Sequence, residues 1–321
     1  MSVPQYLRKV SLKIGNDDQA LDLSDLHFRF VIRRGDIQTP NTADIIVYNV
    51  SDNTAQSVQK EYTRVVLQAG YDGSFGVIFD GTIKQVRRGR ESPTDTYLAI
   101  TAADGDSAYN FATLNVTLAA GSTAKDRLDE MEKVLGPHGV SIGYTPTLDD
   151  SKLPRGRVFF GPVKNYLSWL VKNAEAKWSI QDGTVQICPL NSYVPGTPVI
   201  VSYATGMIGL PEETINGLNM KMLLNPNVKI GTLIQIDNAS IQQYRFGMST
   251  SNTVDNENIL LMRDKHNDGY YYVMIAEHYG DTRGNDWYTV VRCLAVDATW
   301  GTGDYVSRGV ALDSGAIKSY G

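Results

Sequence analysis

The stretch from residue 205 to residue 236 limits the fold more than any other part of the chain, because it divides into three short strand-like runs. Residues 207–210 form an apolar run that ends at Pro211, and residues 218–224 alternate apolar and polar side chains. A third run, 233–236, follows a segment rich in Asn, Pro and Gly. Proline fixes φ, whereas Asn and Gly tolerate positive φ, so these residues favour turns between strands. The stretch offers no catalytic residues and predicts β structure suited to assembly.

Residues 8–104 carry the same β pattern with one helix. Six runs with partial alternation are separated by Gly, Asp, Asn or Pro clusters: residues 10–14, 27–33, 43–50, 64–68, 76–86 and 97–102. Between the third and fourth runs, Asn53 as N-cap and Gln56 at the third helical position predict a short helix to about Lys60. This order is expected of a small barrel with a lateral helix, so we assign residues 1–104 to a first β-barrel domain.

The hydrophobic period changes after residue 105. Thr123 is expected to cap a helix whose apolar face is formed by Ala124, Leu128, Met131 and Leu135 and which ends at Gly136-Pro137. A second helix is expected after Pro162, and Asp182-Gly183 predicts a type I′ turn between two strands. Residues 105–188 therefore form a separate α+β module.

From residue 189 to residue 300 the β pattern returns and repeats a hairpin of the first domain. Residues 81–86, a polar tip and residues 94–101 correspond to residues 272–278, another polar tip and residues 285–292. Ile83 to Tyr97 spans fourteen positions, and Ile275 to Tyr288 spans thirteen. We therefore expect residues 189–300 to form a second, similar barrel, which makes the fold mainly β with an intervening helix-containing domain.

The last segment, residues 301–321, is rich in Gly and Ser but keeps several apolar residues. This composition is typical of a C-terminal docking tail that orders on a partner. A loosely held terminus is the alternative interpretation.

Length and charge narrow the classes of function. A chain of 321 residues exceeds the usual size of one hydrophobic core, so two or three domains are expected. The net charge of −5 excludes the overall basic surface that drives sequence-independent DNA binding. A channel wall that DNA passes without specific binding is compatible with this charge.

The cysteines and the hydropathy of the chain indicate how it folds and where. Cys188 and Cys293 lie far apart, each in a strand-like run, and are expected to be buried thiols rather than a disulfide or a metal pair. The first ten residues lack the apolar core of a signal peptide, and no run approaches the length of a membrane span. The chain is therefore expected to fold in a cytoplasm without a membrane span.

Two clusters resemble sites for chemistry without meeting its requirements. Glu277, His278 and Asp281 contain the groups of a metal or proton-transfer site, but neighbours on a strand point to opposite faces, which favours a structural hairpin. The segment 264–269 resembles the start of a calcium loop, yet its third position is His266 and its twelfth is Ile275. Nucleotide-binding and hydrolase motifs are absent, so we expect no enzyme, no cofactor and no metal.

Basic residues concentrate in the first long hairpin, at Lys84, Arg87, Arg88 and Arg90. These four are the candidate contacts with a partner or a lumen, and the contacted surface is expected to be DNA, another protein or an acidic face of a neighbouring subunit. A solvated hairpin tip is the alternative.

Several short motifs, taken in order, resemble one protein family. They are Val47-Tyr-Asn-Val-Ser51, Leu67-Gln-Ala-Gly-Tyr71, Phe79-Asp-Gly-Thr-Ile83, the opening Thr205-Gly-Met-Ile-Gly-Leu-Pro211, Leu223-Leu-Asn-Pro226 and Ala276-Glu-His-Tyr-Gly-Asp-Thr-Arg-Gly-Asn-Asp-Trp-Tyr288. Together they resemble the baseplate hub proteins of tailed bacteriophages, over most of residues 20–300, and a contractile tail is expected. In that family, trimeric rings join the tail tube to the central spike.

The resemblance implies a structural protein of the virion baseplate that is assembled in the host cytoplasm. Three copies, each with two tube-like barrels, would form a pseudo-sixfold ring between the hexameric tube and the trimeric spike, leaving a lumen for DNA and the tape measure. Implied partners are two further copies, the tail tube or its initiator ring, the central spike, the tape measure protein and the baseplate wedge proteins. Alternatives are a tail-tip peptidoglycan hydrolase, whose carboxylate pair leaves no local signature, the hub part of a tailocin or type VI secretion spike, and a carbohydrate-binding adhesin.

Overall fold

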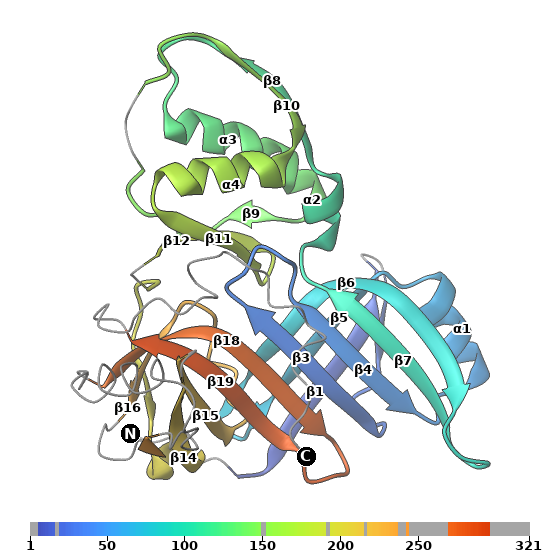
Figure 1. Ribbon diagram of the computed structural model, residues 1–321. Coiled ribbons are helices and arrows are strands. Elements are labelled where there is room, and N and C mark those ends of the chain that lie inside the picture. Colours follow the sequence, from blue (N-terminus) through green and yellow to red (C-terminus); the bar gives the residue numbers. More distant parts are fainter. Residues whose placement is uncertain are drawn as a thin grey trace, which may run out of the picture.

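The computed structural model describes residues 6–16, 19–148, 152–190, 193–214, 217–236, 242–243 and 269–295. Two β domains lie side by side and a helix-containing module stands above them (Figure 1). The largest buried clusters of apolar side chains follow this division, one for each β domain and one for the module. The predicted mainly β fold with a helix-containing part is confirmed. The predicted docking tail, residues 301–321, and most of the calcium-like segment lie outside the described residues.

The first β domain is an antiparallel sheet with one lateral helix. Its elements are β1 (Arg8–Gly15), β2 (Ala20–Asp22), β3 (Phe28–Gly35), β4 (Thr42–Tyr48), α1 (Asp52–Lys60), β5 (Arg64–Tyr71), β6 (Ser74–Arg90) and β7 (Thr96–Ala103). Alternate residues of β3, among them Phe28, Phe30 and Ile32, are buried in the core. The N-cap of α1 is Ser51, not Asn53 as predicted, because Ser51 has extended backbone angles and its side chain accepts a hydrogen bond from the Thr54 N–H.

The middle module packs two helices against short strands. Its elements are α2 (Asp106–Phe111), β8 (Thr113–Leu118), α3 (Ala124–Leu135), the 3-10 turn Gly136–His138, β9 (Ser141–Ile142), β10 (Arg157–Pro162), α4 (Val163–Asn173), β11 (Ala176–Gln181) and β12 (Thr184–Pro189). The Thr123 cap of α3 is confirmed and forms a capping box with Asp126. Asp182 and Gly183 have φ of 53° and 72°, which confirms the predicted turn between β11 and β12.

The second β domain contains β13 (Val199–Val201), the 3-10 turn Tyr203–Thr205, β14 (Met207–Thr214), β15 (Gly217–Leu223), β16 (Leu233–Ile236), β17 (Gln242–Gln243), β18 (Tyr270–Asp281) and β19 (Trp287–Ala295). The prediction that the first run ends at Pro211 is wrong, because β14 continues to Thr214. Its pairing with β15 shifts register between Ile208 and Glu212. This irregularity admits a proline, which lacks the N–H of a regular ladder.

The two β domains share one strand order. The first domain runs β3-β4-β7-β6-β5 and the second runs β14-β15-β19-β18-β16, with every neighbouring pair antiparallel. Each long hairpin has a register shift at the same place, between Ile83 and Gln85 in one and between Val273 and Ile275 in the other. The shared shift makes Ile83 equivalent to Val273, so the predicted match of Ile83 with Ile275 is wrong by two residues. The predicted repeat itself is present in the strand topology.

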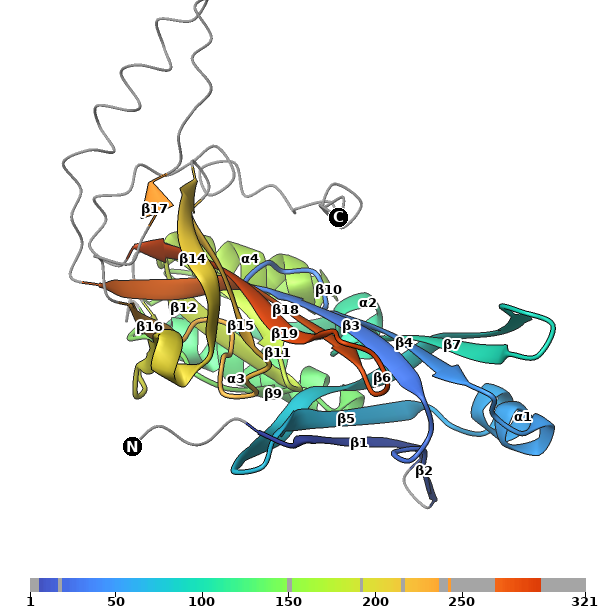
Figure 2. The same cartoon turned by 90° about the horizontal axis from the view of Figure 1, so that it is seen from below.

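A direct strand pairing joins the two domains. The first residues of β18 pair with β16, whereas Ile275–Asp281 pair antiparallel with Arg29–Gly35 of β3. The sheet therefore continues through β14-β15-β19-β18-β3-β4-β7-β6 without interruption. From below, these strands lie across the molecule as a curved layer (Figure 2).

Candidate assembly surface

The curved layer has two different faces. One face covers the hydrophobic cores, and the other carries charged, polar, aromatic and aliphatic side chains, as the two-residue period of a strand requires. These side chains are half-buried or exposed, except for the buried Glu277. Members of this open face are Arg29, Val31, Arg33, Asp44, Ile46, Ala99, Thr101, Asn219, Lys221, Glu277, Tyr279, Tyr288, Val290 and Arg292, as their paired registers show. The sequence predicted the strands but not which face would stay open.

Side chains on the open face contact each other across the strands. Arg33 Nη1 lies 2.7 Å from Asp44 Oδ2, whose carboxylate also accepts a hydrogen bond from Thr101 at 3.1 Å. At the other domain, the Lys221 ammonium lies 3.6 Å from the centre of the Tyr288 ring. These contacts involve both charge signs, and the residues named here do not form a pair of nucleophile and base.

The junction between the domains is held by a carboxylate. Asp281 Oδ2 accepts a hydrogen bond from Arg29 Nε at 2.8 Å, and its Oδ1 lies 2.9 Å from His27 Nε2. The backbone N–H groups of Arg283 and Gly284 also donate to Oδ1. Burial alone would raise the pKa of Asp281, but these donors stabilise the ionised form and lower its pKa to about 2.

The predicted cluster of Glu277, His278 and Asp281 does not converge on one point. His278 faces the core, where Nδ1 lies 2.9 Å from Thr289 Oγ1, and burial lowers its pKa to about 3. Glu277 faces the opposite side and accepts a hydrogen bond from the Tyr279 hydroxyl at 2.8 Å. The interpretation as a structural hairpin is therefore confirmed, whereas the contact of Asp281 with His27 was missed, because it joins residues 254 positions apart.

The four basic candidates lie along one half of β6. Residues 74–82 of β6 pair with β5 and residues 82–90 pair with β7, so no described strand covers the second edge of the basic half. Lys84 contacts Asp106 and Arg88 contacts Asp52. Arg87 donates to the Gln85 side chain at 2.7 Å, and Arg90 donates to the Pro93 carbonyl at 3.3 Å. Within the described residues, neither Arg87 nor Arg90 forms an ion pair.

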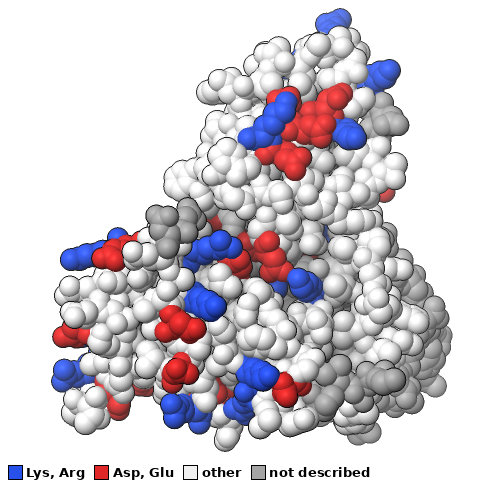
Figure 3. Space-filling view, turned by 180° about the vertical axis from the view of Figure 1, so that it is seen from behind, with Lys and Arg blue, Asp and Glu red and all other residues white. Residues whose placement is uncertain are grey.

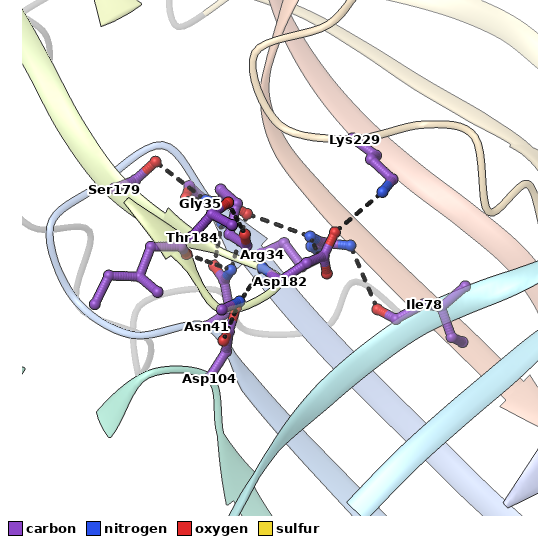
Figure 4. A network of polar contacts seen from close by, with 12 residues as sticks. Arg34, Gly35, Asn41, Ile78, Asp104, Ser179, Asp182, Thr184 and Lys229 are labelled. Atoms are coloured by element: carbon purple, nitrogen blue, oxygen red, sulfur yellow. Dashed lines mark hydrogen bonds and ion pairs between the residues drawn. The ribbon is translucent and has the colours of Figure 1, made fainter. Parts of the chain in front are cut away.

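A buried polar network fixes the middle module at the junction of the β domains (Figure 4). Arg34, 3% exposed, donates to Asp182 Oδ1 at 2.7 Å, and Lys229 of the second domain lies 3.2 Å from the other carboxylate oxygen. Asp104 accepts hydrogen bonds from the N–H groups of Asp182 and Gly183, at 2.7 and 3.0 Å. Burial raises the pKa of Asp104 to about 6. The sequence predicts the turn at Asp182, but no local pattern in the sequence marks the partners of this residue.

The two cysteines, the hydropathy of the helices and the surface charge complete the comparison with the predictions. Cys188 and Cys293 are buried thiols that form no disulfide, as expected, and burial raises the pKa of both. No helix in the described ranges has the length and hydropathy needed to cross a membrane. Basic and acidic side chains are interspersed on the rear surface, without a broad region of one sign (Figure 3).

Known proteins match this chain by structure and not by sequence. No family model matches the sequence, and no curated protein sequence matches it. The 43 kDa tail protein of prophage MuSo2 from Shewanella oneidensis superposes with a TM-score of 0.56 at 10% identity, over 90% of this chain and 99% of that one. The chain has the fold of phage tail proteins. This confirms the predicted resemblance at the level of the fold.

Two other solved structures support the same fold. The tail protein from Neisseria meningitidis MC58 has a TM-score of 0.52 at 11% identity, over 92% of this chain and 98% of that chain. The E. coli c3393 protein has a TM-score of 0.52 at 10% identity, over 92% of this chain and 78% of that chain. That protein is described as a component of the type VI secretion system with structural similarity to the T4 tail proteins gp27 and gp5.

Proposed function

We propose that this protein is a non-enzymatic baseplate hub whose three copies form a ring of six similar β domains between a hexameric tail tube and a trimeric central spike. The observation that carries the proposal is the pairing of β18 with β3, which joins two domains of equal strand order inside one chain. A ring closes when each unit presents two complementary faces. Each chain already contains two similar β domains that are joined by such complementary faces, at the pairing of β18 with β3. Three copies of the chain therefore supply six quasi-equivalent positions.

The continuous layer supplies the wall of the proposed lumen. Its open face carries both charge signs, which suits passage of DNA and the tape measure protein without tight binding. The middle module stands away from the layer (Figure 1), where it would meet the wedge or spike proteins. In this proposal the protein belongs to the virion tail baseplate and is assembled in the host cytoplasm.

A second candidate follows from the match with c3393, a component of the type VI secretion system. The chain would then be the hub part of a secretion spike or tailocin, with the same ring geometry. Co-purification with phage particles, as opposed to a secreted effector complex, separates the two.

Light scattering on the purified protein tests the ring. Three chains of 35.4 kDa give about 106 kDa for a closed trimer, and this mass is the expected result. A mass of one chain at every concentration, both alone and with the spike protein present, would overturn the proposal. Release of soluble fragments from peptidoglycan by the protein would instead favour the hydrolase alternative.

A further inference from the structure

The joint inside the chain predicts how two copies meet. Strand order makes β6 equivalent to β18 and β14 equivalent to β3, and the edges of β18 and β3 are already used on each other. The corresponding edges are the basic half of β6, which no described strand pairs with, and the outer edge of β14, where the two-residue β17 is the one described strand that pairs. We propose, on the basis of the proposed ring, that β6 of one copy pairs antiparallel with β14 of the next copy, and that opposite charges select this pairing.

The register of the proposed pairing between copies follows from the strand pairings within one chain. Gln85 is equivalent to Ile275 through the shared shift, which makes Gly89 equivalent to Tyr279. In the second domain Glu212 of β14 pairs with Asn219 of β15, and in the first domain Val31 of β3 pairs with Asp44 of β4. The pairings of β15 with β19 and of β4 with β7 make Asn219 equivalent to Asp44, so Glu212 is equivalent to Val31.

Since Tyr279 lies opposite Val31 in the chain, Gly89 lies opposite Glu212 between copies. Thr214 then falls opposite Arg87, and Glu213 falls at the register position opposite Arg88. Arg87 is thus a diagonal neighbour of Glu212 on one face of the proposed sheet. Long side chains in such diagonal positions can reach each other.

Charge supports this register and also excludes the wrong joints. From residue 82 to residue 90, β6 carries Lys84, Arg87, Arg88 and Arg90 and no acid, whereas β14 carries Glu212 and Glu213 and no base. Pairing β6 with a second β6, or β14 with a second β14, sets like charges side by side. The open edges therefore favour head-to-tail association, the type of contact from which rings are built, over a two-fold dimer.

At the pairing of β18 with β3 inside the chain, the acidic and basic residues are placed the other way round. There the acids are on β18, with Glu277 opposite Arg33 and Asp281 opposite Arg29 of β3. A β6 edge placed on β3 would set base against base, and a β14 edge placed on β18 would set acid against acid. The reversed polarity thus distinguishes the joint within a copy from the joint between copies during folding.

One described element covers part of the proposed edge. The two residues of β17, Gln242 and Gln243, pair parallel with Glu212 and Glu213 of β14. A pairing of two residues is weak compared with a longer pairing along the eight-residue strand β14. We therefore expect the β6 strand of the next copy to replace β17 on association. In the isolated chain the same contact shields β14 from unspecific edge pairing.

Charge reversal on β6 tests the selection. The triple variant Arg87→Glu, Arg88→Glu and Arg90→Glu should weaken association on the order of tenfold to a hundredfold, measured by concentration-dependent light scattering. Adding Glu212→Lys and Glu213→Lys to the same chain should restore the trimer. The control is Lys125→Glu with Lys133→Glu on the exposed side of α3, which should leave the mass unchanged. A trimeric triple variant, or a failed restoration with folded protein, would overturn the charge selection.

Disulfide trapping tests the register without relying on affinity. Oxidation of a variant with Arg87→Cys and Thr214→Cys should give covalent dimers and trimers on a denaturing gel. The control pair Arg87→Cys and Ile208→Cys lies out of register and should stay unlinked. If the wild type is trimeric but the in-register pair does not link, the inferred joint is wrong while the ring stands. If the wild type is never trimeric, the proposed function fails first.

Discussion

Replacing Asp281 by Asn removes the charge that holds β18 to β3 and should loosen the joint between the β domains. The pKa of Asp281 is about 2, against an ordinary value of 3.8, and one pKa unit corresponds to about 1.4 kcal/mol. The full shift is therefore worth roughly 2.4 kcal/mol. The Arg29 side chain is 52% exposed, so solvent screening reduces the expected loss to about 1–2 kcal/mol.

Hydrogen exchange measures this loss where it occurs. Backbone amides in β18, from residue 276 to residue 280, should exchange roughly five- to thirtyfold faster in the Asp281→Asn variant at neutral pH. The control variant Asp72→Asn removes an exposed ion pair with Lys9 and should change these amides little. Equal protection of β18 in the wild type and in Asp281→Asn would refute the assigned role.

The pH dependence has a definite sign. The pKa of Asp281 is lower in the folded state than in the unfolded state, so its contribution is present above pH 4 and is lost as the pH falls towards 2. The Asp281→Asn variant should lack this part of the acid sensitivity. A wild type and a variant with parallel acid titrations of β18 protection would contradict the account.

Three further predictions concern the buried groups. Replacing Arg34 by Met leaves Asp182, within the described part of the chain, with the exposed Lys229 as its one remaining cation, and should cost about 3 kcal/mol. This loss is measured as faster exchange at the β11–β12 turn, and an unchanged rate would count against the network. The pKa of Asp104 is raised to about 6, so its contribution to docking of this turn is present below pH 4 and falls by about 3 kcal/mol as pH rises through 6. The Asp104→Asn variant should show a flatter pH dependence. A variant with the wild-type slope would exclude Asp104 as the source of this dependence. Cys188 and Cys293 should resist a thiol reagent in the native protein and react fully after unfolding; rapid native reaction at both thiols would contradict their burial.

Local signals in the sequence predicted the elements well. Thr123 capped α3 as expected, because a capping box needs only residues three positions apart. The Asp182-Gly183 turn was likewise a local property of two residues with positive φ. Where two local signals competed, the prediction failed: Ser51 took the N-cap in place of Asn53, and a bulge carried β14 through Pro211.

Contacts between distant residues were out of reach. The pairing of β18 with β3 depends on registers between positions separated by about 250 residues, and nothing local marks it. The network of Arg34 and Asp104 with the β11–β12 turn has the same origin. The basic residues of β6 were found as a charge run, but their free edge became visible only once the neighbouring strands were placed.

Electron cryomicroscopy of the purified oligomer, viewed along its axis, tests the central claim most directly. The account predicts three copies arranged as six similar β domains around an open lumen, with three middle modules outside the wall. It also predicts one unbroken sheet, in which β6 of each copy continues into β14 of the next. A two-fold dimer, or a trimer whose β domains do not alternate around a lumen, would contradict it.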